Sequence, residues 1–319
     1  MKKFLFSRLL RASITIFIAV TITFLILRVM PGDPTSMMLD SRMSEATRQK
    51  LLEGFGLDQN LLVQYFIFLK QLFLNFDLGN SFVHRSPVVE VIMSRLPWTL
   101  ILMIASIIIT TLIGIPMGVL AAYRKGSFTD QIINAFSIFG IAIFLPWLAI
   151  SLLYLFGLQI PLFPIGGAVD HNLSGWAYIV SVGHHLILPV FTLTIINLAN
   201  YVLFMRASMV DVLSEDYIRT ARAKGLRERV VVWRHATRNA MLSTITMMGL
   251  QVGTIVGGAI LTETVFAYPG LGRLIYEAVQ EHDYPVLQGT FLILAITVVV
   301  VNIITDVIYT YLDPKIKFN

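Results

Sequence analysis

Histidine is the side chain in this sequence best suited to chemistry, as a metal ligand or as a general acid or base. The six histidines are His84, His171, His184, His185, His235 and His282. No HExxH or related ligand spacing connects them, and the absence of cysteine excludes disulfides, thiolate metal sites and cysteine nucleophiles. For the His184–His185 pair, a contact with a metal substrate and an ordinary role at the membrane interface both remain open. We predict no catalytic residue and no metal site in this chain.

A nucleotide-binding motif is missing as well. The pattern G-x-x-x-x-G-K-[ST], whose backbone cradles phosphates, occurs nowhere in the sequence. An autonomous ATP-driven pump is therefore excluded, and we expect this chain to bind no cofactor.

The densest group of charged side chains lies between Glu215 and Ala240, where EDYIRTARAKGLRERVVVWRHATRNA holds seven Lys or Arg residues. We expect Ser214 to cap a helix that has Glu215 and Asp216 in its first turn. Gly225 is predicted to end this helix with a positive φ, and a second basic helix with an apolar face follows it. A cytoplasmic loop whose only role is to set the orientation of the protein in the membrane needs just a few basic residues. The caps, the break and the apolar face therefore indicate a docking element.

The elements that must position this segment are membrane spans. Hydrophobic residues make up 56% of the chain and charged ones only 13%, whereas soluble domains have about 25% charged residues. We predict an all-α membrane protein with six transmembrane helices. They cover about 14–27 (extended back through 4–10), 99–123, 131–158, 186–204, 245–261 and 289–311. The first is interpreted as an uncleaved anchor, because its apolar stretch exceeds that of a signal peptide and no cleavage site follows.

The distribution of basic residues predicts the orientation. Sixteen of the 24 Lys and Arg residues fall in 1–11, 124–125, the basic segment with Arg206, and the C-terminal tail. These pieces are expected in the cytoplasm together with both termini. The same rule explains the net charge of +5, so we expect a lipid bilayer as partner and no nucleic acid.

A small extracytoplasmic region is predicted between the first two spans. Ser44 is expected to cap one helix that runs through Glu53. The stretch NLLVQYFIFLKQLFLNF, residues 60–76, is predicted to form a second, amphipathic helix. This second helix lies on the membrane surface, covers the outer mouth of a pore or packs against the spans; the sequence leaves these alternatives open.

Two spans carry glycine at every fourth residue. These are Gly114 and Gly118 in the second span, and Gly249, Gly253 and Gly257 in the fifth. Such stripes let helix backbones approach closely in lipid, either inside the chain or across a subunit interface. Pro116 and Pro146 lie inside spans and are expected to kink them.

Five stretches carry a resemblance to a known family: MPGDP, DYIRTARAKGL, RHATRNAML, LTETVFAYPGLGRL and DYPVLQG. In this order and spacing they resemble the dipeptide/oligopeptide/nickel permeases of ATP-binding-cassette importers, over nearly the whole chain. The basic segment is similar to the cytoplasmic loop of that superfamily. Arg219, Thr220 and Ala221 stand at its Glu-Ala-Ala positions and Gly225 is its glycine. Ser243 replaces the proline that usually follows this stretch.

The resemblance implies an importer permease core at 99–319 with a coupling loop at 211–240, and an N-terminal anchor plus extracytoplasmic region at 1–98. It implies a second homologous permease subunit, two ATPase subunits that hold ATP and Mg, and an extracytoplasmic substrate-binding protein. The location implied is the cell membrane of a bacterium or archaeon. The residues assigned to ATPase coupling are Asp216, Tyr217, Arg219, Thr220, Ala221, Ala223, Lys224, Gly225, Arg238 and Asn239. The small side chain of Ala221 is expected to seat the first helix in a groove of the ATPase.

The function implied is uptake of di- or oligopeptides through a pathway of which this chain forms half. Import of nickel or oligosaccharides by the same machinery remains an alternative, because the binding protein sets most of the specificity. An ion-driven secondary transporter is disfavoured, since the spans hold no mid-membrane carboxylate and no repeat is evident. The candidates for lining the pathway are Asn197, Asn200, Met247 and Gln251.

Overall fold

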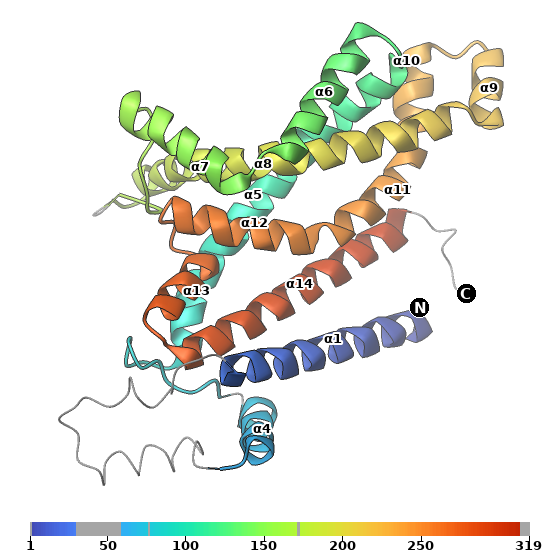
Figure 1. The fold of residues 1–319 in the computed structure, drawn as a ribbon. Helices are drawn as coiled ribbons and strands as arrows, with labels where there is room; N and C mark the ends of the chain where they lie inside the picture. The colour runs from blue at the N-terminus through green and yellow to red at the C-terminus, as the bar shows by residue number, and fades with distance from the viewer. Residues whose placement is uncertain (1, 30–58, 76, 171–172, 313–319) are drawn as a thin grey trace.

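The computed structural model describes residues 2–29, 59–75, 77–170 and 173–312. Within these ranges every regular element is a helix, as the composition predicts. The two longest, α5 (Val88–Tyr123) and α8 (Trp176–Leu213), pack against each other through the middle of the bundle (Figure 1). α1 (Lys2–Val29) and α14 (Tyr284–Leu312) lie side by side and run in opposite directions.

Length and composition qualify several of these helices as membrane spans. Among the described residues, α5, α8 and Tyr284–Thr305 of α14 are long and apolar enough to cross a bilayer, and two bent helix pairs raise the number to five if each pair is one span. α1 contributes a shorter apolar stretch, Leu10–Ile26. The chain is therefore an all-α membrane protein with several spans.

The third predicted span is broken rather than merely kinked. α6 (Phe128–Ala142) and the helical stretch formed by α7 (Leu145–Leu153) and η2 (Tyr154–Gln159) meet at 97°. Ile143 and Phe144 adopt extended backbone between them and so interrupt the helix. Pro146 then stands in the first turn of α7, the one helical position that tolerates it well. The prediction of one kinked helix over 131–158 is therefore wrong.

The fifth predicted span is also bent. α11 (Thr237–Leu250) and α12 (Val252–Val265) meet at 56°, with Gln251 between them. The break lies between two glycines of the stripe, Gly249 and Gly253, where the helix is intrinsically weak. By contrast, Pro116 stays inside the continuous helix α5.

The predicted amphipathic outer helix is present as α4 (Leu61–Lys70), which continues into η1 (Gln71–Asn75). It packs against α1: the rings of Tyr65 and Phe68 lie 5.2 and 5.6 Å from the ring of Phe24, and the Tyr65 hydroxyl lies 2.6 Å from that of Thr21. Contact with α1, the predicted first span, agrees with one of the three alternatives for this helix. The helix expected from Ser44, the MPGDP stretch and the cationic C-terminal tail lie outside the described residues.

The glycine stripes have two different environments. A Cβ on Gly114 would lie 2.9 Å from the Cβ of Tyr201, and one on Gly118 would lie 2.6 Å from the Cβ of Met205. The lack of a side chain at both glycines therefore allows α8 to pack closely against α5. Gly249 similarly allows Thr305 of α14 to pack closely, since its Cγ2 would lie 2.9 Å from an added Cβ. The other two members of that stripe, Gly253 and Gly257, have no such neighbour within 4 Å.

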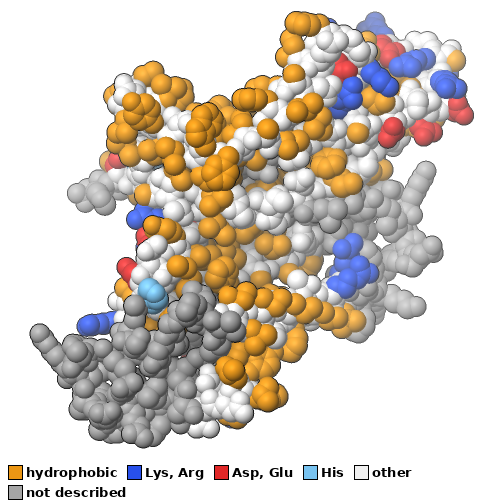
Figure 2. Space-filling view, viewed as in Figure 1, with side chains coloured by type: hydrophobic (Ala, Val, Ile, Leu, Met, Phe, Trp, Pro, Cys, Tyr) orange, Lys and Arg blue, Asp and Glu red, His pale blue; other side chains and the backbone are white. Residues whose placement is uncertain are grey.

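The two ends of the bundle differ in chemistry. α9 (Asp216–Ala223) and α10 (Glu228–Val230) protrude at the end toward which the N-terminus of α1 and the C-terminus of α14 point, whereas α4 and α13 (Leu271–Gln280) lie at the other end (Figure 1). Figure 2 shows charged side chains gathered over α9 and α10, with apolar side chains along the helices between the two ends. The folded charged protrusion is therefore the candidate site.

Candidate docking site

The protrusion begins where α8 ends. Ser214 does not cap the following helix as predicted: it is the C-cap residue of α8, and its hydroxyl donates to the carbonyl of Asp211 at 2.7 Å. Glu215 takes the N-cap position of α9 in extended conformation. Asp216 then lies in the first turn, where its charge favours the helix N-terminus. The predicted helix is confirmed, but its start differs by one residue because Ser214 bonds backward along the chain.

Gly225 ends α9 as predicted, with a φ of +74°. Its N–H donates to the carbonyl of Arg222 at 2.9 Å, and the N–H of Leu226 donates to that of Ala221 at 3.4 Å. This bond pair is a Schellman motif, which requires a left-handed residue at its end. No atom lies within 4 Å of an added Cβ, so the backbone conformation and not crowding calls for glycine.

Two side-chain links fix the angle between the helices of the protrusion. Across the Gly225 turn, the Arg222 guanidinium donates to the Glu228 carboxylate, with Nη2 2.7 Å from Oε1. This partner also raises the pKa of Arg222 above its usual range. From α9 to α11, the amide of Asn239 donates to the Tyr217 hydroxyl at 2.6 Å. The protrusion is therefore braced on both flanks rather than free to bend at its glycine.

The inner face of α9 packs on the chain itself. Ile218 is fully buried and Ala221 is 7% exposed. They belong to an apolar cluster whose other buried members are Val119, Ala122, Met205, Met209, Val231, Val232, Ala236 and Ala240. The small size of Ala221 thus serves packing within the chain, in a cluster drawn from α5, α8, η3 (Val231–Ala236) and the start of α11. The expectation that it seats the helix in a partner's groove does not fit this position.

The remaining assigned residues lie on the outer face of α9, in the turn that follows it and at the start of α11. They are exposed: Asp216, Tyr217, Arg219, Thr220, Ala223, Lys224, Gly225, Arg238 and Asn239. Leu226, an apolar side chain that is 40% exposed at the turn, lies among them. The result is a rigid, mixed-charge tip with an apolar residue at its end, suited to insertion into a complementary groove.

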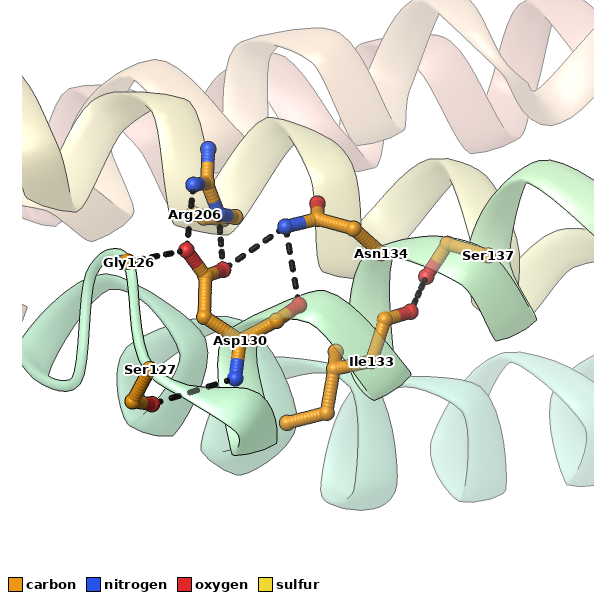
Figure 3. A network of polar contacts seen from close by, with 7 residues as sticks. All are labelled: Gly126, Ser127, Asp130, Ile133, Asn134, Ser137 and Arg206. Atoms are coloured by element: carbon orange, nitrogen blue, oxygen red, sulfur yellow. Dashed lines mark hydrogen bonds and ion pairs between the residues drawn. The ribbon is translucent and has the colours of Figure 1, made fainter.

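An ion pair between a buried carboxylate and a partly exposed guanidinium braces the base of the protrusion (Figure 3). Arg206 of α8 donates to both oxygens of Asp130 at 2.6 and 2.8 Å. The same carboxylate accepts from the N–H of Gly126 at 2.9 Å and from the amide of Asn134 at 2.7 Å. The hydroxyl of Ser127 accepts from the backbone N–H of Asp130 at 3.4 Å and so caps α6. The α5–α6 turn is thereby tied to the end of α8 that leads into α9.

Sequence analysis missed this network, although Arg206 was counted for topology. The two partners lie far apart along the chain, and the only local signal was a single carboxylate three residues after a serine at the start of a span, the pattern of an N-cap. Nothing in that pattern indicates which cation the carboxylate meets.

Arg206→Gln is expected to lower the stability of the protein by about 3 kcal/mol or more, because it leaves Asp130 buried without its counter-charge. Arg206→Lys should recover only part of the loss, since an ammonium cannot reproduce the two-pronged contact. Thermal unfolding of the detergent-purified protein measures both. Arg124→Gln, which removes an exposed cation of the same turn, is the control, and an equal loss from it would contradict the assignment.

A second polar network shapes the opposite end of the bundle. Glu263 at the end of α12 is fully buried, and its Oε2 accepts from the N–H of Gly272 at 2.6 Å and of Arg273 at 3.4 Å in the first turn of α13. A Cβ on Gly270 would overlap the Glu263 carboxylate, and one on Gly272 would overlap the Cα of Ile260. Within the stretch ETVFAYPGLGR, Glu263 thus caps the next helix, and Gly270 leaves room for its carboxylate. Sequence analysis quoted this stretch without finding that role.

The four pathway candidates have different environments. Asn197 of α8 is buried, and its amide donates to the carbonyl of Leu193 in its own helix at 2.7 Å. Asn200 is partly buried on the same helix, Met247 is 41% exposed on α11, and Gln251 stands at the bend before α12. Of these four, Met247 presents the most accessible side chain.

The described histidines make local contacts. Nε2 of His184 lies 2.8 Å from the carbonyl of Leu162, and Nδ1 of buried His185 lies 2.9 Å from that of Ser181. No group of three or more His, Asp or Glu side chains that could hold a metal occurs among the described residues.

Comparisons with known proteins agree with this architecture. Residues 114–318 match the family of the binding-protein-dependent transport system inner membrane component, and residues 1–103 match the N-terminal family of such membrane components. The oligopeptide transport system permease protein AppB of Bacillus subtilis is 40% identical over 96% of both chains. The dipeptide transport system permease protein DppB of Escherichia coli K12 is 39% identical over 94% of this chain and 95% of its own.

A further relative, a putative peptide transport system permease protein of Brucella abortus, is 36% identical over the full length of both chains. In fold, a chain from inward-facing structures of the MetNI methionine ABC transporter matches with a TM-score of 0.56 and 17% identity, over 70% of this chain and 96% of that one. This likeness supports the fold alone. The two family matches and these relatives confirm the resemblance seen in the sequence: the chain belongs to the family of binding-protein-dependent transport system inner membrane components, the permease subunits of ABC importers.

Proposed function

We propose that this chain is one of two permease subunits of an ABC importer and forms half of a pathway for peptide uptake. The observation that carries the proposal is the braced helix–glycine–helix protrusion at one end of the spans in a chain of this family. The chain is not itself an enzyme, because ATP hydrolysis in this family belongs to separate ATPase subunits. ATP and Mg are accordingly bound by those partners, and the exposed tip of α9 enters one of them.

The contacts of α9 suggest how a movement of the ATPase subunit is transmitted to the membrane helices. Its inner face belongs to an apolar cluster with residues of α5, α8, η3 and the start of α11, and the Asp130–Arg206 pair joins α8 to the α5–α6 turn. A push on α9 therefore moves these helices as one body rather than bending a loop. Such rigid-body rocking, with a homologous permease moving in the opposite sense, alternates access between the two sides of the membrane.

The proposed substrate class comes from the relatives. The permeases named for oligopeptide and dipeptide transport match nearly the whole of this chain, and a soluble binding protein outside the membrane would deliver the cargo. Nickel or an oligosaccharide remains an alternative cargo. Titration of the binding protein with di- and oligopeptides, Ni²⁺ and oligosaccharides distinguishes them, and tight binding of a non-peptide alone would exclude peptide uptake.

The transport proposal is tested in proteoliposomes that contain both permeases and both ATPases. We expect labelled peptide to accumulate only when binding protein and ATP are both present. Accumulation driven by an ion gradient, without ATPase subunits, would instead establish a secondary transporter.

The proposed orientation has six passes with both termini in the cytoplasm. Because no native cysteine exists, single cysteines report it without background. At the exposed positions Asn60 and Gln280, cysteine is expected to react with an impermeant thiol reagent added to intact cells. At the exposed positions Lys125 and Leu226 it is expected to react only after the membrane is opened. Labelling of position 226 from outside would refute the orientation.

A further inference from the structure

Three buried hydroxyl groups of the two central helices have no hydrogen-bond partner in the described part of the chain. They belong to Ser106 and Thr110 of α5 and to Thr194 of α8, residues that are 1%, 1% and 4% exposed. A hydroxyl that is taken out of water without a partner is unfavourable. Three such groups in one pair of helices therefore need an explanation.

Other buried hydroxyls of the membrane helices bond within their own helix. The hydroxyls of Thr192, Thr262 and Thr290 donate to the carbonyl four residues earlier, at 2.8, 2.9 and 2.6 Å. This bond is an ordinary solution for threonine or serine in a span, because the bilayer core offers no water. The three unpartnered hydroxyls do not make it, so they are available to a partner outside their own helix.

The two hydroxyls of α5 belong to the face that packs on α8. Ser106 and Thr110 precede Gly114 and Gly118 at intervals of four residues, so all four lie on one face of the helix. At both glycines α8 lies so close that an added Cβ would have no room. The face that carries the two hydroxyls is therefore turned toward α8.

The hydroxyl of α8 lies at the same level of this interface. Thr194 precedes Leu198 by one turn, as Thr110 precedes Gly114 on α5. The Cδ1 of Leu198 would lie 3.3 Å from a Cβ on Gly114. Because α5 and α8 run in the same direction (Figure 1), one turn back on each helix brings Thr110 opposite Thr194. Ser106 follows one turn further along the same face.

We propose that Ser106, Thr110 and Thr194 bind one internal water molecule between α5 and α8. A buried water makes about three hydrogen bonds to polar groups that lack other partners, and the three hydroxyls supply that number. Each hydroxyl can donate or accept, so one water can satisfy all three.

The water gives the two central helices a polar link where their neighbouring contacts are apolar. Together with the Asp130–Arg206 pair, which joins α8 to the α5–α6 turn, it braces α5 and α8 at two levels. The proposal does not depend on the importer function or on the cargo.

A cryo-EM map of the intact importer, at a resolution that shows ordered water, tests the site directly. We expect a density peak between α5 and α8 within about 3 Å of all three hydroxyl oxygens. The absence of this peak would overturn the proposal. So would a direct bond between the hydroxyls of Thr110 and Thr194, or a bond from each hydroxyl to the carbonyl four residues earlier.

A double-mutant cycle tests the same site without a map. Thr110→Val and Thr194→Val are each expected to lower the Tm of the purified protein by about 3 °C. The double variant should lose no more than either single variant. The first replacement already releases the water, and the second removes a hydroxyl that is then unpartnered.

The matched control pair is Thr192→Val with Thr290→Val, whose hydroxyls bond within two separate helices. Their two Tm shifts should add. Additive shifts for Thr110→Val and Thr194→Val would overturn the proposal. If one of these variants does not accumulate, the density map of the unaltered protein still decides.

Discussion

Ala223→Glu is expected to stop peptide uptake and to release the ATPase subunits, while the membrane part of the chain stays folded. Ala223 is exposed in the last turn of α9, beside Gly225, so a longer side chain has room in the isolated chain. A groove that receives this tip would bury the new carboxylate without a partner, at a cost of about 3 kcal/mol or more. Since about 1.4 kcal/mol is a tenfold change in affinity, recovery of ATPase subunits on pull-down should fall by roughly a hundredfold.

Two matched variants separate docking from folding. Ala221→Glu places the same charge two residues away but inside the chain's own apolar cluster, so it should lower thermal stability and make the protrusion sensitive to protease. Arg229→Gln changes an exposed residue of α10 and should affect neither property strongly. If Ala223→Glu leaves both ATPase recovery and uptake intact, α9 is not the docking element.

Gly118→Ala is expected to destabilise the protein by about 3 kcal/mol, although it adds a single methyl group. That methyl would lie 2.6 Å from the Cβ of Met205 and 2.9 Å from the carbonyl oxygen of Val202. The oxygen belongs to the backbone of α8, so the two long central helices would have to separate. Thermal unfolding in detergent and the yield of folded protein measure the loss.

Gly253→Ala is the control for this change. It makes the same substitution in another span, but no neighbouring atom lies within 4 Å of the new methyl, and alanine favours the helix. Its stability should equal or slightly exceed that of the unaltered protein. Equal destabilisation by both variants would show that the close approach of α5 and α8 is not what Gly118 provides.

The parts of the fold that the sequence predicts are those set by local chemistry. Uncharged stretches of sufficient length predict spans, and glycine at residue 225 predicts a left-handed stop because few other residues adopt that conformation at low cost. The charged protrusion could therefore be located, with its two helices and its break, before any contact was known.

The parts that escape prediction depend on contacts between distant residues. The apolar positions of α9 indicate that one face is buried, but not whether this chain or a partner buries it, and Ala221 was therefore given to the wrong neighbour. Asp130 and Arg206 lie on different spans, so their sequence context cannot pair them. Likewise, a proline inside an apolar stretch predicts some deflection, whereas the angle of 97° before α7 depends on what holds α7.

The packing of α7 also has a consequence for the order in which the helices reach their final positions in the membrane. α7 packs against α8 and α12, both of which follow it in the chain. As the chain emerges from the ribosome, the uncharged stretch from Gln131 to Val169 enters the bilayer before either support exists. The sharp angle can be secured only after α12 has been synthesised and inserted. We therefore expect α7 to reach its final position late in the maturation of the protein, after most of the chain has been inserted.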